Sequence, residues 1–334
     1  MTSHVRIGVI GVGGMGRTHA WNLNGAVPGA QLVGVADPRI DTIDRDALPP
    51  VPRYQDYRQL LESDLDAIVI AAASTAHAEV LKAAVSFQHP VFCEKPLALT
   101  LEDSVAIHRL YESLKVPLQM GFMRRFDPQY RRAFDLIQEG AIGTPYHYSG
   151  ISRDRVGPAL EVMRYSGGFY LDTGVHEFDI ARWLLHSEIT SVFARGGIYN
   201  HPEYETVNDV DQAHVSFQCE SGAMGLVELS RDAVYGYEIR TEVLGTRGAV
   251  QVVQVNATGT ALLVDGEVRR DTYRDYAERF REAYFHEMQG FVEMVRTGGK
   301  PSVGSVDGIR ATVVAQAAQR SLLSHRDETV VNPV

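Results

Sequence analysis

The chain has 334 residues, of which 45% are apolar and 22% charged, which is typical of a soluble globular protein with about two domains. Its formal net charge of -10 argues against a nucleic acid or an anionic membrane surface as the main partner. The two cysteines, Cys93 and Cys219, cannot form a disulfide framework and fit a reducing compartment.

The apolar stretch near the N-terminus is interrupted at once by glycines and lacks a convincing small-residue cleavage pattern. It is therefore not typical of a signal peptide. No apolar run approaches the ~20 residues that would span a bilayer. We expect a cytoplasmic protein.

Five short apolar runs in the first part of the chain predict buried strands. They cover residues 5–10, 31–36, 67–72, 91–95 and 117–122. Apolar runs without polar alternation are typical of parallel strands that are covered on both faces. Helical patterns lie between several of them, for example over 75–87 and 101–114. This alternation predicts a doubly wound α/β domain over residues 1–122.

The pattern changes in residues 123–334, which we expect to form an α+β domain. Helical patterns cover 128–140, 172–186, 277–297 and 305–324. Strands are predicted over 146–152, 191–199, 212–220, 223–231, 237–245, 248–255 and 261–270, separated by turn signals. The second domain is therefore predicted to be an antiparallel sheet with flanking helices, and its last helices are able to pack back on the first domain.

A glycine-rich hexad follows the first predicted strand and opens a helical pattern. It consists of Gly11, Val12, Gly13, Gly14, Met15 and Gly16 and fits G-x-G-x-x-G. Such glycines let the backbone turn tightly and approach a pyrophosphate at the helix N-terminus. Asp37 ends the next strand, at the spacing typical of dinucleotide binding, where it would accept from a ribose and repel a 2′-phosphate. NAD is therefore favoured, although Arg39 keeps NADP possible.

Lys95 is a candidate for chemistry because it ends a predicted strand. The carboxyl ends of parallel strands share one edge of the sheet, so Lys95 emerges at the edge that carries the glycine loop. Pro96 fixes its own φ and biases the preceding residue towards extended geometry. Taken alone, Lys95 is equally consistent with an ordinary surface lysine.

Asp172, His176 and Asp179 are spaced to lie along one face of the predicted helix over 172–186. This polar stripe is consistent with an N-capping aspartate on a solvated face, or with the lining of a pocket. The pair His176 and Asp179 has a spacing that metal ligands also use, but no third or fourth ligand accompanies it. Since no Cys/His spacing resembles a zinc site either, we expect no metal ion.

Taken in order, the glycine loop, Asp37, Glu94-Lys95-Pro96 and Asp172-x-x-x-His176 resemble the Gfo/Idh/MocA family of sugar and polyol dehydrogenases. The stretches VFCEKPLA, GFMRRFD and SGGFYLDTGVHEFDIARWLL more specifically resemble inositol 2-dehydrogenases. The likeness runs over most of the chain and is expected to end at the terminal helices. It implies a Rossmann domain and a second domain with a large, mainly antiparallel open sheet, whose outer face forms a homodimer or homotetramer interface.

The resemblance also implies roles for individual residues. The catalytic triad carries over to Lys95, Asp172 and His176, and contacts to substrate hydroxyls carry over to Arg125, Asp154 and Tyr235. Ser74, His77 and Glu94 are expected near the cofactor. The implied reaction is NAD-dependent oxidation of a secondary hydroxyl of myo-inositol or a related inositol to a ketone.

Physical chemistry suggests a role for each member of the triad. A histidine has an unperturbed pKa of roughly 6.5, which suits His176 to accept the hydroxyl proton. In the first turn of its helix, the positive end of the helix dipole would keep the ring neutral. Asp172 is expected to cap the helix or bond the substrate hydroxyl, and Lys95 to stabilise the developing alkoxide. Asp179 is expected to orient the imidazole.

Three alternatives stay open at this point. One is the same chemistry on a sugar or glucoside, for example oxidation at C3. Another is a non-catalytic NAD-binding sensor, although a sensor has no need of a proton acceptor. The third is an NAD-dependent glycosidase, which would release a sugar without net NADH.

Among the clustered aromatic residues Phe169, Tyr170, Tyr235 and Tyr237, only Tyr235 is favoured as a sugar contact, and the others are expected in the core.

Overall fold

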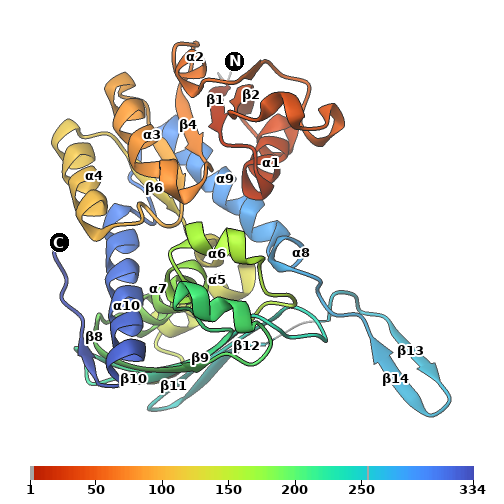
Figure 1. Cartoon of the computed structure of the whole chain (residues 1–334), viewed down its shortest axis with the longest axis vertical. Helices are drawn as coiled ribbons and strands as arrows, with labels where there is room; N and C mark the ends of the chain where they lie inside the picture. Colours follow the sequence, from red (N-terminus) through yellow and green to blue (C-terminus); the bar gives the residue numbers. More distant parts are fainter. Residues whose placement is uncertain (1–3, 254–255) are drawn as a thin grey trace. The chain divides into compact units, whose positions relative to one another are not determined.

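The computed structural model describes residues 4–253 and 256–334, which fall into two compact units (Figure 1). The first unit comprises the chain up to Phe126 together with Ala283–Ile309 and the last two residues. The second comprises Asp127–Glu282 and Arg310–Asn332. Within the described residues, no helix combines the length and the apolar character that crossing a membrane requires.

The first unit contains a six-stranded sheet in the order β3-β2-β1-β4-β5-β6, in which every neighbouring pair is parallel. Its strands are β1 (Val5–Ile10), β2 (Ala30–Ala36), β3 (Arg53–Tyr54), β4 (Ala67–Ile70), β5 (Val91–Glu94) and β6 (Leu118–Gly121). The predicted doubly wound sheet is confirmed, with several strands one or two residues shorter. The strand order reverses between β1 and β4, and ligands of such sheets bind beside the loops that leave this point.

The helices of the first unit are α1 (Gly14–Trp21), α2 (Tyr57–Leu61), α3 (His77–Ala84), α4 (Leu101–Leu114) and, from late in the chain, α9 (Arg281–Thr297). The prediction for α4 is confirmed, and the hydroxyl of Thr100 caps it by accepting from the N–H of Asp103. The helix predicted over 75–87 is divided, because 3-10 turns flank α3 on both sides.

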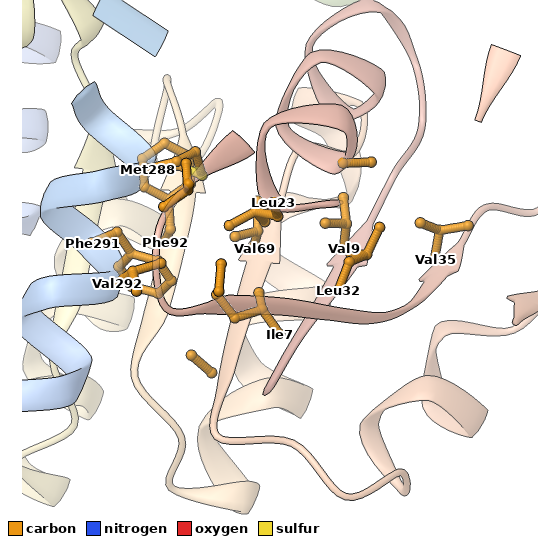
Figure 2. Close-up of a cluster of buried hydrophobic side chains, with 14 of the residues drawn as sticks. Ile7, Val9, Leu23, Leu32, Val35, Val69, Phe92, Met288, Phe291 and Val292 are labelled. Atoms are coloured by element: carbon orange, nitrogen blue, oxygen red, sulfur yellow. The ribbon is translucent and has the colours of Figure 1, made fainter. Parts of the chain in front are cut away.

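Helix α9 contributes to the core of the first unit. Figure 2 shows its side chains Met288, Phe291 and Val292 beside Phe92 of β5, and all four are at most 2% exposed. The rings of Phe92 and Phe291 meet edge to face, with centroids 5.8 Å apart. A helix from the last part of the chain therefore completes the hydrophobic core of the parallel-sheet unit.

The second unit is built on a seven-stranded sheet in the order β12-β11-β7-β10-β9-β8-β15. The strands are β7 (Pro145–Arg153), β8 (Ile189–Gly197), β9 (Gln212–Cys219), β10 (Met224–Ser230), β11 (Glu238–Gly245), β12 (Gly248–Val252) and β15 (Glu328–Thr329). Only β10 and β7 run parallel, so the expectation of a mainly antiparallel sheet is confirmed.

One face of this sheet is covered and the other is open. Along β9, buried and exposed residues alternate, as expected for a strand with one solvated face. The helices of this unit include α5 (Pro128–Gln138), α6 (Leu160–Ser166), α7 (Val175–Leu185) and most of α10 (Ser305–Ser324), whose first residues, up to Ile309, belong to the first unit. Figure 1 shows α5, α7 and α10 on the same side of the sheet. Their packing leaves the opposite face open.

Three predictions for the second part of the chain were wrong in detail. Residues 261–270 form a hairpin, β13 (Ala261–Val264) and β14 (Glu267–Arg270), that turns at the predicted Asp265–Gly266 signal and extends away from the sheet (Figure 1). The helix predicted over 277–297 is broken at Phe280, whose φ of -105° and ψ of 20° are not helical, into α8 (Tyr276–Arg279) and α9. The strand predicted over 248–255 ends at Val252, and residues 254–255 lie outside the described residues.

Candidate active site

The glycine loop joins β1 to α1 and packs closely against the loop that follows β4. Gly11 has a φ of 86°, and a Cβ on it would lie 2.3 Å from the Cα of Ala72. A Cβ on Gly16 would lie 1.8 Å from the carbonyl oxygen of Gly11. By contrast, a Cβ on Gly13 would meet nothing within 4 Å. The loop is thus tight on its inner side and open at Gly13, as close approach of a pyrophosphate requires.

Asp37 follows β2 and is fixed to this loop by backbone hydrogen bonds. Its Oδ2 accepts from the N–H of Val12 at 3.0 Å, and its Oδ1 accepts from the N–H of Arg39 at 2.8 Å. Each carboxylate oxygen keeps a second lone pair for another donor, such as a ribose hydroxyl. The glycine loop and the held carboxylate therefore fit a dinucleotide. The side chain of Arg39 is exposed.

The loops after β4 and β5 are tied together by His77, the first residue of α3. Its ring is 1% exposed, with Nδ1 2.7 Å from the carbonyl oxygen of Pro96 and Nε2 3.0 Å from that of Ala72. Burial lowers the pKa of His77. Ser74 lies in the 3-10 turn before α3 and is half-buried. The structure therefore gives His77 a buried linking position between two loops at the carboxyl edge of the sheet.

Glu94 is the last residue of β5, and Lys95 is the first residue after it, at the carboxyl edge of the sheet. The Oε1 of Glu94 lies 2.7 Å from Nε2 of His19 on α1. Lys95 is half-buried and is joined to Pro96 by a cis peptide bond. Glu94 and Lys95 thus occupy the carboxyl end of the strand, where the sequence predicted them.

Arg125 has an ion-pair partner that the sequence did not indicate. It lies in the 3-10 helix Met123–Phe126, and its Nη2 is 2.9 Å from Oδ1 of Asp307, within the first unit. Its side chain is 10% exposed. Any contact that Arg125 makes to a substrate would therefore come from a guanidinium already held by a carboxylate.

In the second unit, Asp172 lies beside a buried arginine that the sequence analysis did not identify. Nη1 of Arg231 is 3.5 Å from Oδ2 of Asp172, and Nη2 is 3.9 Å from Oδ2 of Asp209. The Arg231 side chain is 1% exposed, and its guanidinium lies 4.4 Å from the ring centroid of Phe169. Arg231 ends the segment AMGLVELSR, and a charged residue directly after an apolar strand was the only signal for it.

Asp209 completes this cluster. Burial raises the pKa of Asp209, while the charge of Arg231 and hydrogen bonds from the backbone act in the opposite direction. Those bonds come from the N–H of Phe169 at 3.2 Å and the N–H of Val210 at 2.9 Å. Two carboxylates therefore share one buried guanidinium, and only Asp172 keeps substantial exposure, at 33% of its side chain.

The structure corrects the predicted cap of the helix that carries His176. Asp172 lies in a π-helical turn, Tyr170–Gly174, and the cap of α7 is Gly174, with no side-chain hydrogen bond. The helical path thus begins before α7, and His176 lies more than one turn along it. Because the dipole effect fades within the first turn, His176 lies farther from the helix end than the predicted dipole effect requires. His176 itself is half-buried.

Asp179 is buried one turn beyond His176. It is 1% exposed, and its Oδ1 lies 3.7 Å from Nη1 of Arg182. Its predicted role in orienting the imidazole stays a prediction. Arg182 also donates to both carboxylate oxygens of Glu188, at 2.6 and 2.9 Å. The lower part of α7 is therefore held by an ion-pair network.

Asp154 and Tyr235 lie at the end of β7 and just after β10. The backbone of Asp154 donates to Ser230 at 2.9 Å and accepts from Ala233 at 2.7 Å. The Tyr235 hydroxyl accepts from Nη1 of Arg153 at 2.7 Å and donates to the carboxylate of Glu238. Tyr235 is 50% exposed. The other three aromatic residues named from the sequence, Phe169, Tyr170 and Tyr237, are buried, which confirms them as core.

His201 is a titratable group that the sequence analysis missed. Its Nε2 lies 3.0 Å from Asp232, and its ring stacks on Tyr204 with centroids 4.6 Å apart. Burial alone would lower the pKa of His201, but the hydrogen bonds and charges of Asp232 and Glu203 outweigh it and raise the pKa. The ring thus joins two chain segments through a bond that depends on pH.

Comparisons with known proteins agree with this arrangement. Residues 5–122 match the model of the oxidoreductase family with an NAD-binding Rossmann fold, and residues 130–251 match the GFO/IDH/MocA C-terminal domain. The scyllo-inositol 2-dehydrogenase (NAD(+)) of Bacillus subtilis is 39% identical over 96% of this chain and 95% of the relative. The myo-inositol 2-dehydrogenase of Thermotoga maritima is 36% identical over 96% of this chain and 97% of the relative.

A crystal structure of scyllo-inositol dehydrogenase from Lactobacillus casei, with bound NAD(H) and scyllo-inositol, superposes with a TM-score of 0.91. It is 26% identical and covers 98% of this chain and 99% of that one. Coverage of this extent includes the terminal helices, where the likeness had been expected to end, so that expectation was wrong. The chain belongs to the Gfo/Idh/MocA family of oxidoreductases.

Proposed function

We propose that the chain is an NAD-dependent dehydrogenase that oxidises a secondary hydroxyl of myo-inositol or a related inositol to a ketone. The observation that carries this proposal is the likeness, over nearly the whole chain, to proteins named inositol 2-dehydrogenases. It is supported by the presence of Lys95, Asp172 and His176 in the order and spacing of the family's triad.

The first unit supplies the cofactor half of the proposed site. Bound NAD would supply the hydride acceptor. Gly11, Gly13, Gly14, Met15 and Gly16 would bring backbone N–H groups towards the pyrophosphate. The fixed carboxylate of Asp37 would accept from the ribose hydroxyls and repel a 2′-phosphate, which favours NAD over NADP. Ser74 and His77 follow β4, Glu94 ends the neighbouring strand β5, and we assign all three to the same half. Arg39 is the residue through which NADP would bind.

The second unit supplies the proton acceptor. His176 would accept the proton of the substrate hydroxyl and pass it on to solvent, while bound NAD would take the hydride from the carbon. Asp172 would hold the substrate hydroxyl, with its charge kept in place by Arg231. Lys95 would stabilise the negative charge that develops on the oxygen. This assignment leaves each of the three side chains a different task.

Arg125, Asp154 and Tyr235 are proposed as contacts to the remaining hydroxyls. Arg125 is held by Asp307, and Tyr235 by Arg153 and Glu238, so both have fixed positions within their own units. Groups whose positions are fixed in advance discriminate between ring stereoisomers better than free side chains do. A sugar or glucoside oxidised at C3 would undergo the same chemistry, and it is the second candidate substrate class.

We further propose a cytoplasmic homodimer or homotetramer that associates through the open face of the large sheet. Met224 and Leu226 on β10 are 57% and 46% exposed on that face. Exposed apolar side chains on an otherwise polar sheet are typical of an association surface. Size-exclusion chromatography with light scattering measures the molar mass of the assembly. Leu226→Lys should shift that mass towards the monomer.

The substrate test uses the purified protein with NAD, then with NADP. The panel comprises myo-, scyllo- and chiro-inositol, glucose, xylose and simple glucosides, and the measurement is NADH absorbance. Fast NADH formation with an inositol and NAD supports the proposal. Activity confined to sugars keeps the triad and changes the substrate. Tight nucleotide binding without turnover would indicate a sensor, and a released sugar without net NADH would indicate a glycosidase.

A further inference from the structure

In the first unit, two buried side chains that the cofactor site does not explain, His19 and Glu287, lie beside Glu94. His19 on α1, Glu94 at the end of β5 and Glu287 on α9 each offer a ligand atom, and these atoms lie within 4.8 Å of one another. Nε2 of His19 is 2.7 Å from Oε1 of Glu94. Three segments far apart in the sequence therefore bring one imidazole and two carboxylates together.

Glu287 is the unusual member of this group. It is 0% exposed, and within the described part of the chain neither of its carboxylate oxygens has a hydrogen-bond partner. Burial raises the pKa of Glu287, and the charge of Glu94 raises it further. An ionised carboxylate in such a place is strongly disfavoured unless an opposite charge compensates it.

The surroundings of the group are apolar and closely packed. The ring of His19 meets Phe92 and Tyr284 edge to face, with centroids 5.2 and 6.0 Å apart. Met288, the neighbour of Glu287 on α9, is fully buried (Figure 2). Oε2 of Glu94 lies against Gly121, where an added Cβ would be 2.7 Å from it. The side chain of Glu94 is 13% exposed and those of His19 and Glu287 are fully buried, so solvent screens the charges of this group only weakly.

A single proton does not complete the group. Protonation would remove the charge of Glu287, but its carbonyl oxygen would still be buried without a donor, and so would Nδ1 of His19, which also has no hydrogen-bond partner within the described residues. A divalent cation would neutralise both carboxylates at once and provide the missing partner of Glu287. A neutral imidazole with two carboxylates is a ligand set typical of zinc and of similar transition metals.

We propose that His19, Glu94 and Glu287 form a binding site for one divalent transition-metal cation, represented by Zn²⁺ or Mn²⁺. The site is structural. It joins the helix that follows the glycine loop, the strand that precedes Lys95, and the late helix α9. Such a cation would stabilise the packing of α9 on the sheet, and it has no part in the transfer of hydride or proton.

The first test needs only the wild-type protein. Elemental analysis after purification without chelators is expected to find about one transition-metal ion per chain. Chelation should lower Tm, and ZnCl₂ or MnCl₂ should restore it by roughly 5 °C at 100 times the dissociation constant. A protein that contains no metal, and whose Tm neither salt changes, would overturn the proposal and assign a proton to Glu287 instead.

The second test uses matched variants. Glu287→Gln keeps the shape of the side chain and removes its charge, so it should lose the bound metal and the Tm response. Glu282→Gln changes an exposed glutamate in the first turn of the same helix and should keep both. His19→Gln should behave like Glu287→Gln and guards against a folding defect in one variant. Full metal content in folded Glu287→Gln would contradict the proposed site.

Discussion

The candidate residues fall into two halves, one in each unit, and the two are built in different ways. Around Gly11–Gly16, the shape comes from the backbone, because added Cβ atoms would collide with main-chain atoms at Gly11 and Gly16. Around Asp172, it comes from side chains, because a buried guanidinium, Arg231, lies between two carboxylates. Substitutions in the first half should therefore act by steric collision. Those in the second half should act by changing charge or proton transfer.

The largest expected effect is in the side-chain half. His176→Ala should lower kcat by about 10²–10⁴, the usual contribution of a general base, while the fold and NAD affinity stay unchanged. The measurements are steady-state kinetics, circular dichroism and an NAD titration. His4→Ala, at an exposed histidine of the first unit, is the control. Near-normal turnover in His176→Ala would remove the proposed role.

The charge cluster gives the next effect. Arg231→Met leaves the carboxylates of Asp172 and Asp209 without their shared cation, and should lower the free energy of unfolding by about 3–5 kcal/mol. Arg231→Lys keeps the charge but loses the guanidinium that lies 4.4 Å from the ring centroid of Phe169, so its stability should fall by less. Urea unfolding measures both variants. Equal stability of Arg231→Met and wild type would show that the cluster does not depend on this cation.

The backbone half is tested by two alanines in the same loop. Gly16→Ala places a Cβ on the carbonyl oxygen of Gly11, so the loop must shift, and Tm should fall by an amount equivalent to about 1–3 kcal/mol. Gly13→Ala meets no protein atom, so Tm should stay constant while NAD affinity falls, because the methyl group stands where the cofactor approaches. A lower Tm in both variants would contradict the expected difference between Gly16, which packs against the protein, and Gly13, which faces the cofactor.

A smaller effect is expected at Asp37. Asp37→Ser removes the charge that repels a 2′-phosphate, and should raise the ratio of kcat/KM for NADP over NAD by about tenfold, which corresponds to about 1.4 kcal/mol. Kinetics with both cofactors measure the ratio. Asp41→Ser, at an exposed acid in the 3-10 turn after β2, is the control and should leave the ratio unchanged.

The smallest effect concerns pH. The pKa of His201 is raised in the folded state. Its bond to Asp232 therefore stabilises the protein fully when the pH is below the pKa of histidine in the unfolded chain, about 6.5. This contribution is lost as pH rises through the folded pKa. The free energy of unfolding should therefore differ between wild type and His201→Asn by less than about 1 kcal/mol at pH 6. This difference should shrink as the pH rises to 8. A difference that grows with pH would reverse the assignment.

The sequence by itself determined what is encoded locally. Each of the motifs lies within a few residues or within one β-α-β unit: the glycine loop, Asp37, Lys95 and the Asp172-x-x-x-His176 spacing. Five strands of the first unit were predictable for the same reason, since burial on both faces leaves a continuous apolar run. The edge strand β3 was missed because its two residues, Arg53 and Tyr54, form no such run. Family membership followed from those motifs, and the comparisons confirmed it.

Only the tertiary structure decided which charges meet. Arg231 reaches Asp172 and Asp209 from the residue that follows β10, Asp307 holds Arg125 from α10, and Glu287 joins His19 and Glu94 from the last part of the chain. The π-helical turn that replaces the predicted cap also depends on this packing. The physical reason is that a buried charge is stabilised by whatever lies within a few ångströms, and sequence spacing gives no measure of that distance.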